Sequence, residues 1–232
     1  MFAFIKKRRL NKEKEAMYMD EVMTAAQDGD SEAQHCLGLH YLYGTNGFRQ
    51  NKILALQWLH SSAEQNYELA FATLAHAYLT GHILEPSDNL FIKWGLRYLE
   101  SIHYGPDCQD ELGDTFAQQI GVRYLKGEGI EQNFQEAVKW LSVPAQKGDE
   151  TAQFQLGMAF YSDESPLRNQ LQAVDWFSLA AGKGYMDAQR ALGLCFLLGE
   201  GVEADIDAAR YWFTQAAEQG DEVAWTALRK YC

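Results

Sequence analysis

The sequence lacks the motifs by which most enzymes and metal proteins are recognised. Six histidines are scattered along it: His35, His40, His60, His76, His82 and His103. They form no His-Glu-x-x-His pattern, and no Gly-x-Ser-x-Gly occurs. Two Gly-Glu-Gly segments, at residues 127–129 and 199–201, follow no strand pattern and lack a third glycine, so we predict turns rather than phosphate-binding loops. These absences favour a protein that is not an enzyme and uses no metal or cofactor.

Cysteine is also scarce. The chain has four cysteines, Cys36, Cys108, Cys195 and Cys232, and none belongs to a Cys-x2-Cys pair. A disulfide framework and a zinc site are therefore both disfavoured, and reduced thiols in a cytoplasmic protein are expected.

Long apolar runs are missing as well. No stretch approaches the roughly 20 apolar residues of a membrane span. At the amino end a five-residue apolar stub precedes the basic residues 6–9, the reverse of the order in a secretory signal. We predict a basic tail over residues 1–15 without stable membrane insertion. A weak surface anchor or a partner-binding arm is the alternative role for this tail.

Basic residues are sparse outside the tail. The whole chain has a net charge of −12, but residues 1–14 carry six of its 20 basic residues and one of its 32 acidic residues. The remainder, with 14 basic and 31 acidic residues, has a net charge of −17. Such a body should repel nucleic acid and anionic membranes, so a basic or apolar partner is expected. The alternative is that the carboxylates serve solubility alone.

What the sequence does contain is a repeat. Five of the six tryptophans are spaced 36, 46, 36 and 36 residues apart, each after an Ala-x3-Leu-Gly-like signature: Trp58, Trp94, Trp140, Trp176 and Trp212. A period in this range is typical of stacked repeat arrays. We expect Trp176 to lie in the core, with an exposed functional role as the alternative.

The last complete copy indicates two helices joined by a glycine turn. Ala188, Leu192 and Phe196 recur at helical spacing and therefore share one buried face. Seven residues before the tryptophan of four copies stands a predicted N-cap: Asn51, Asn133, Asn169 and Asp205. Helix ends are predicted at residues that tolerate the left-handed conformation: Gly29, Asn66, Gly105, Gly148, Gly184 and Gly220.

The pattern Ala-Gln-x-x-Leu-Gly-x-x-Tyr/Phe-x-x-Gly-x-Gly-Val, followed by Asx, Ala-x-x-Trp and Ala-Ala-x-x-Gly, resembles the Sel-one-like repeat, a relative of the tetratricopeptide repeat. The resemblance covers residues 16–232 and implies an all-α, right-handed α-solenoid that assembles protein complexes. We expect about five helix-turn-helix repeats, at about residues 30–65, 66–104, 105–147, 148–183 and 184–219, with a half-repeat before them and a carboxy-terminal cap at 220–232.

Residues 84–144 depart from the pattern. Residues 84–88 replace the glycine–valine turn, and the stretch from Trp94 to Gly105 is three residues longer than usual, so that helix end should be displaced. In the third copy the helix opening occurs twice, which predicts a first helix extended by about two turns. Pro144 should kink or shorten the second helix of that copy. The irregularity indicates either a specific function or tolerated drift.

A candidate binding surface lies opposite the core face of the first helices. The positions two before and two after the signature leucine, or Ile120 in the third copy, point nearly away from the core at 100° per residue. Nine of these residues are candidates for the floor of a concave groove, and Ala72 occupies the tenth position: His35, Leu39, His76, Gln118, Val122, Phe154, Met158, Arg190 and Leu194. Their apolar members suggest an interaction site. Packing between successive first helices is the competing explanation.

The sequence thus predicts a non-enzymatic, cytoplasmic scaffold or adaptor that holds a protein or peptide in a concave groove. Phe154 and Met158 would be apolar anchors, while His35, His76, Gln118 and Arg190 would orient the partner. An immunity or inhibitor protein that neutralises a toxin or effector is an alternative. A component of envelope or secretion machinery is another, and the tail is its only indication.

Overall fold

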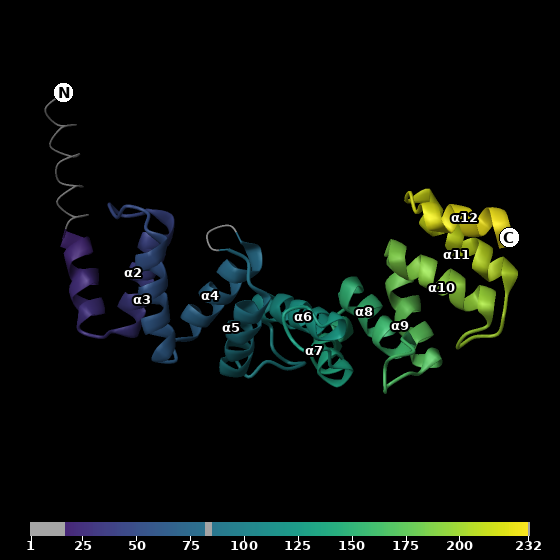
Figure 1. The fold of residues 1–232 in the computed structure, drawn as a ribbon, viewed down its shortest axis with the longest axis horizontal. Coiled ribbons are helices and arrows are strands. Elements are labelled where there is room, and N and C mark those ends of the chain that lie inside the picture. Colours follow the sequence, from purple (N-terminus) through teal and green to yellow (C-terminus); the bar gives the residue numbers. More distant parts are fainter. Residues whose placement is uncertain (1–16, 82–84, 232) are drawn as a thin grey trace, which may run out of the picture. The chain divides into compact units, whose positions relative to one another are not determined.

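The computed structural model describes residues 17–81 and 85–231 (Figure 1). Within these residues all regular elements are helices and no strand occurs. The all-α prediction is confirmed. The chain divides into two compact units, Met1–His103 and Tyr104–Cys232. The basic tail of residues 1–15, His82 and Cys232 lie outside the described residues.

The first unit begins with a helix at residues 17–27 and continues with two helix pairs. Their bounds are α2 Ser31–Tyr43, α3 Lys52–Glu64, α4 Glu68–Thr80 and α5 Asp88–Ser101. We call α2 and α4, and the corresponding helices of the second unit, the first helices of their repeats. Each first helix packs against the second helix that follows it.

The second unit contains three helix pairs and a final helix. Their bounds are α6 Glu111–Lys126, α7 Phe134–Gln146, α8 Glu150–Tyr161, α9 Gln170–Gly182, α10 Met186–Leu198, α11 Ile206–Glu218 and α12 Glu222–Tyr231. Successive pairs pack on one another, as expected for a solenoid of stacked repeats. Helix α12 packs against α11 and occupies the place of a first helix.

The predicted N-caps of the second helices are confirmed. The side-chain oxygens of Asn51, Asn133, Asn169 and Asp205 accept hydrogen bonds from backbone N–H groups in the first turns of α3, α7, α9 and α11. Ser87 does the same for α5. Both Gly-Glu-Gly segments are turns as predicted, because Gly127 and Gly199 end α6 and α10 in the left-handed conformation.

The signature glycine lets the two helices of a repeat approach closely. A Cβ atom on Gly157 would lie 2.4 Å from the ring of Phe177, and one on Gly193 would lie 2.8 Å from the ring of Phe213. A real Cβ atom essentially never makes contacts this short. The Leu-Gly pair of the signature therefore records a helix-packing requirement.

Burial corrects the expectation for the tryptophans. In four of the copies the large side chain that is completely enclosed in the second helix belongs to the residue after the tryptophan: Leu59, Leu141, Phe177 and Phe213. Trp94 is buried, but Trp176 is only half-buried and packs on the cluster that α6 and α7 of the preceding repeat share with α8. Trp176 thus lies between repeats rather than inside one.

Three details of residues 84–144 differ from prediction. Helix α6 has 16 residues against 13 in α10, a difference of less than one turn rather than two. Helix α7 is not shortened by Pro144, since it has 13 residues, the same as α9. The left-handed residue after α5 is His103, with φ of 50°, and not Gly105. That helix end is displaced, as expected, but it stops earlier than predicted.

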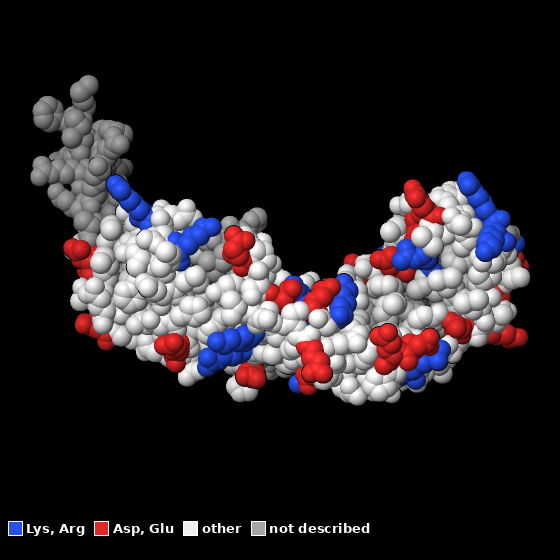
Figure 2. Space-filling view, viewed as in Figure 1, with Lys and Arg blue, Asp and Glu red and all other residues white. Residues whose placement is uncertain are grey.

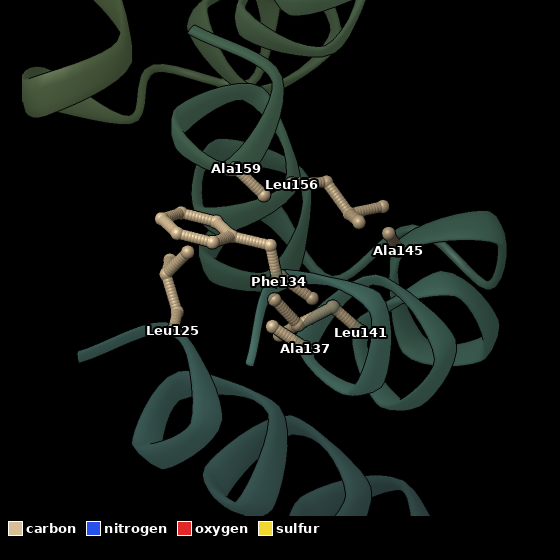
Figure 3. Close-up of a cluster of buried hydrophobic side chains, with 8 residues drawn as sticks. Leu125, Phe134, Ala137, Leu141, Ala145, Leu156 and Ala159 are labelled. Atoms are coloured by element: carbon tan, nitrogen blue, oxygen red, sulfur yellow. The ribbon is translucent and has the colours of Figure 1, made fainter. Parts of the chain in front are cut away.

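Core clusters form where one repeat meets the next. In Figure 3, Phe134, the first residue of α7, points into the cluster near Leu125 of α6 and Ala159 of α8. Phe134 is 7% exposed and Ala159 is fully buried. Residues of three helices thus close one core cluster.

Candidate functional site

The candidate residue His35 lies in a repeat interface. Its side chain is buried, and its Nε2 atom lies 2.9 Å from the hydroxyl of Thr73 in α4. Its ring centroid lies 5.4 Å from that of Tyr67, the residue before α4. Burial lowers the pKa of His35 below its ordinary value, which favours the neutral imidazole. His35 therefore joins α2 to the next repeat, and Ala72, at the corresponding position of α4, is also buried.

The other residues two positions before the signature leucine make the same kind of contact. Each touches the residue that immediately precedes the next first helix. The contacts are Gln118 with Asp149 at 3.5 Å, Phe154 with Tyr185 at 5.4 Å between ring centroids, and Arg190 with Asp221 at 2.5 Å. For this row of candidates, the contacts agree with the alternative explanation, which was packing between successive first helices.

The Arg190 contact is an ion pair at a helix start. The Asp221 carboxylate, almost fully enclosed, accepts from the backbone N–H groups of Val223 and Ala224 and from Arg190. Burial alone would raise the pKa of Asp221, but these hydrogen bonds and the charge of Arg190 lower it overall. Arg190 also pairs with Asp187 at 2.7 Å. The Arg190 guanidinium therefore links α10 to the start of α12.

The row two positions after the signature leucine is more open. Leu39, Val122 and Met158 are half-buried, whereas His76 and Leu194 are exposed. Val122 and Met158 pack from one side against the cluster around Phe134, and Met158 also reaches the next cluster. These side chains rest on the core and keep part of their surface in solvent.

We call Val122, Met158 and Leu194 the first-helix stripe of the second unit. They come from α6, α8 and α10, three successive first helices. One turn before them stand Gln119, Gln155 and Ala191, and one turn after Leu194 stands Leu198, which is 60% exposed. Gln155 and Leu198 were not among the residues expected from the sequence, although their spacing of three or four residues from the stripe was a usable signal. The stripe is an apolar row bordered by an amide and by exposed leucine.

The described residues contain no group of three or more histidine, cysteine or acidic side chains able to hold a metal ion. Cys36, Cys108 and Cys195 are free thiols. Burial raises the pKa of the Cys195 thiol to about 12, so it stays protonated at neutral pH. Cys195 belongs to the buried cluster around Phe177.

Two small pockets lie where first helices begin in the second unit. One, of about 270 Å³, is lined by Asp114, Gln118, Lys147 and Asp149 among others, and the second, of about 290 Å³, includes Glu150, Lys183 and Tyr185. Lys147 is paired with Asp114 at 2.7 Å. The pockets repeat the same inter-repeat junction and have no distinct chemistry.

A family model for the Sel1 repeat matches residues 31–67, 107–149, 151–185 and 187–221. These stretches cover more than half of the chain. The chain belongs to the Sel1 repeat family. Proteins with Sel1 repeats generally mediate protein–protein interactions, and the resemblance inferred from the repeat signature is confirmed.

Three similar proteins illustrate the family. The chain is 28% identical over 112 residues to the ERAD-associated E3 ubiquitin-protein ligase component HRD3B of Arabidopsis thaliana, a match that covers 48% of the chain and 16% of the plant protein. A Sel1 repeat protein from Oxalobacter formigenes is 27% identical, with a TM-score of 0.53 over 90% of this chain and 57% of that one. The antigen c5321 of uropathogenic Escherichia coli, which has an SLR fold, is 23% identical, with a TM-score of 0.50 over 90% and 50%.

The chain spans 57% or less of the length of each of these proteins. The two solved structures establish the solenoid fold. No helix within residues 17–81 and 85–231 is long and apolar enough to cross a membrane.

Proposed function

We propose that this Sel1 repeat protein is a non-enzymatic scaffold or adaptor that binds a protein or peptide partner on the first-helix stripe of its second unit. The observation that carries the proposal is the open apolar row Val122, Met158 and Leu194, with Leu194 38% exposed. The neighbouring row of Gln118, Phe154 and Arg190 is occupied by contacts between repeats. In the second unit, the stripe is therefore the set of candidate residues that we infer a partner can reach.

The chemistry of the stripe indicates the kind of partner. An amphipathic helix or an extended segment would bury apolar side chains against Val122, Met158 and Leu194. Polar groups such as Gln155 at the border can pair with the partner's backbone or side chains. The acidic body of the chain favours a basic flank on that partner. Figure 2 shows acidic and basic side chains interspersed with a large uncharged surface.

The first unit offers Leu39 and His76 at the same repeat positions. His76 is exposed and Leu39 is half-buried, so they form a smaller counterpart of the stripe. The plant relative's description as a ligase component supports an assembly role for the family. We therefore infer that each unit presents its first helices to a partner and that the main apolar anchors lie in the second unit.

A matched pair of variants tests the stripe. Met158→Ser with Leu194→Ser removes two apolar anchors, and Leu179→Ser removes a 51% exposed leucine from second helix α9. After affinity capture from the native cell and mass spectrometry, we expect the double variant to lose the partner that the wild type and Leu179→Ser both retain. Equal recovery by all three proteins would contradict the proposal.

Stability must be measured on the same variants. Leu194 is exposed, so its replacement should change the melting temperature little. Phe154→Ser is a useful comparison, because Phe154 packs on the rings of Phe177 and Tyr185. We expect Phe154→Ser to lower the melting temperature. A loss of partner by that variant would therefore not locate the partner site. If Leu194→Ser alone unfolds the protein early, the stripe is a packing surface and the proposal fails.

A further inference from the structure

A second apolar surface lies at the carboxy-terminal end of the array, away from the first-helix stripe. The turn between α10 and α11 borders an open pocket of about 730 Å³. We call it the last-turn pocket, and its lining is Phe196, Val202, Glu203, Ala204, Asp205, Ile206 and Asp207. The apolar side chains in this lining are Phe196, Val202, Ala204 and Ile206.

The repeat frame shows why this pocket is open. Ile206 is the first residue of α11, as Phe134 is the first residue of α7, and each directly follows its N-cap. Phe134 is 7% exposed, whereas Ile206 is 54% exposed. A second pair of matching positions lies in the next first helix: Ala159 is ten residues after the capping Asp149, and Tyr231 is ten residues after the capping Asp221. Ala159 is fully buried, whereas Tyr231 is 49% exposed. The last cluster thus lacks the closure that Figure 3 shows for the third repeat.

Carboxylates surround the apolar lining. Residues 199–210 contain Glu200, Glu203, Asp205 and Asp207 against a single basic residue, Arg210. Arg210 pairs with Asp207 at 2.8 Å, and the Asp205 carboxylate caps α11. An excess of negative charge remains beside exposed isoleucine. Such a surface is complementary to an apolar side chain followed by lysine or arginine.

This protein carries a segment of that chemistry in its own sequence. Residues 2–5 read Phe-Ala-Phe-Ile, and residues 6–9 read Lys-Lys-Arg-Arg. The segment is basic, while the rest of the chain has 32 acidic and 16 basic residues. The two parts are complementary in charge and in apolar character.

We propose that residues 2–9 of a second copy of this protein dock in the last-turn pocket. An apolar side chain of residues 2–5 covers Ile206 and Val202, and the basic residues 6–9 face Glu203 and its neighbouring carboxylates. The contact joins two different surfaces, so it is heterologous, and successive copies add head to tail. This self-association is independent of partner binding on the first-helix stripe.

Sedimentation of four full-length proteins tests the contact. The pocket variant carries Ile206→Ser and Glu203→Lys, and the tail variant carries glutamine at Lys6, Lys7, Arg8 and Arg9. The control is Leu171→Ser, because Leu171 is 63% exposed, is the second residue of α9 and does not line the last-turn pocket. Circular dichroism confirms that each protein is folded before it is compared with the wild type.

We expect the wild type and the control to increase in mass with concentration at low salt, and this association to weaken as salt is added. Removing the apolar contact between the docked segment and Ile206 should weaken association by roughly tenfold. Each of the two variants alone should therefore stay monomeric where the wild type associates. Mixed together, they should form a 1:1 complex, because one keeps the tail and the other keeps the pocket.

The following results would contradict the docking proposal. A wild type that stays monomeric at every concentration overturns the proposal. So does a pocket variant or a tail variant that associates as the wild type does, a control that loses association, or a mixture of the two variants that forms no complex. A fluorescent peptide of residues 1–10 gives a second readout: it should bind the tail variant and fail to bind a protein with both sets of changes.

Discussion

The third repeat and the last repeat are built on the same frame and differ in what closes them. In the third, Phe134 is enclosed between α6 and α8, and the next first helix supplies a small residue, Ala159, beneath it. In the last, Ile206 and Tyr231 stand at the matching positions and are both about half exposed. Burial in a repeat array therefore depends on the neighbour as much as on the residue itself.

The largest expected effect contrasts Phe134 with Ile206. Phe134→Ala should destabilise the protein by roughly 3–5 kcal/mol because it empties a closed cluster. Ile206→Ala should cost less than about 1 kcal/mol, since the side chain is largely in solvent. Urea unfolding followed by circular dichroism compares the two. Equal losses would show that the last repeat is as closed as the third.

A smaller effect concerns close helix approach. Gly157→Ala places a Cβ atom 2.4 Å from the Phe177 ring, and the resulting overpacking should cost about 1–3 kcal/mol. Gly182→Ala, also in a helix, meets no atom within 4 Å and should be neutral or stabilising. Thermal unfolding of both variants measures the difference. A tolerated Gly157→Ala would refute the packing explanation of the signature glycine.

A gain in stability is expected at one junction between repeats that lacks a hydrogen bond. The buried Oε1 of Gln153 has no hydrogen-bond partner, whereas the equivalent Gln189 accepts from Gln219 at 2.7 Å. Lys183 stands in the place of Gln219, so Lys183→Gln should supply the missing donor and stabilise the protein by about 1 kcal/mol. The reverse change, Gln219→Lys, should destabilise it. A lower melting temperature for Lys183→Gln would contradict the equivalence of the two junctions.

The smallest expected effect is a pH dependence from His35. Because burial lowers its pKa in the folded state, its contribution to stability is present above pH about 6.5 and decreases as pH falls through the lowered value. His35→Gln keeps a polar group near Thr73 and does not titrate. Its stability should therefore fall less between neutral and mildly acidic pH than that of the wild type. Parallel pH profiles would exclude His35 as the source.

Much of the fold was predictable because the repeat signals are local. Asn51, Asn133, Asn169 and Asp205 cap the helices they were expected to cap, since the capping oxygen and its N–H donors lie within three residues. The Gly-Glu-Gly turns followed from glycine's tolerance of positive φ. The family assignment rested on many such positions together.

The candidate site was less predictable because its contacts span about 31 residues. Phe154 packs on Phe177 of its own repeat and on Tyr185 before the next first helix, and Arg190 pairs with Asp221 before α12. The same limit applies to Trp176, where a rotation of one residue around the helix separates the inter-repeat face from the enclosed Phe177. Periodicity identifies a face of a helix, but not which neighbour lies against it.

The most direct test of the scaffold proposal is site-specific photo-crosslinking in the native cell. A photoreactive residue is placed at Leu194 on the first-helix stripe and, in a second protein, at Leu179 on α9. The stripe predicts a partner crosslink at position 194 that is absent at position 179 and is lost when Met158→Ser is added. Equal crosslinking at both positions, or a partner captured only from position 179, would contradict partner binding on the first-helix stripe.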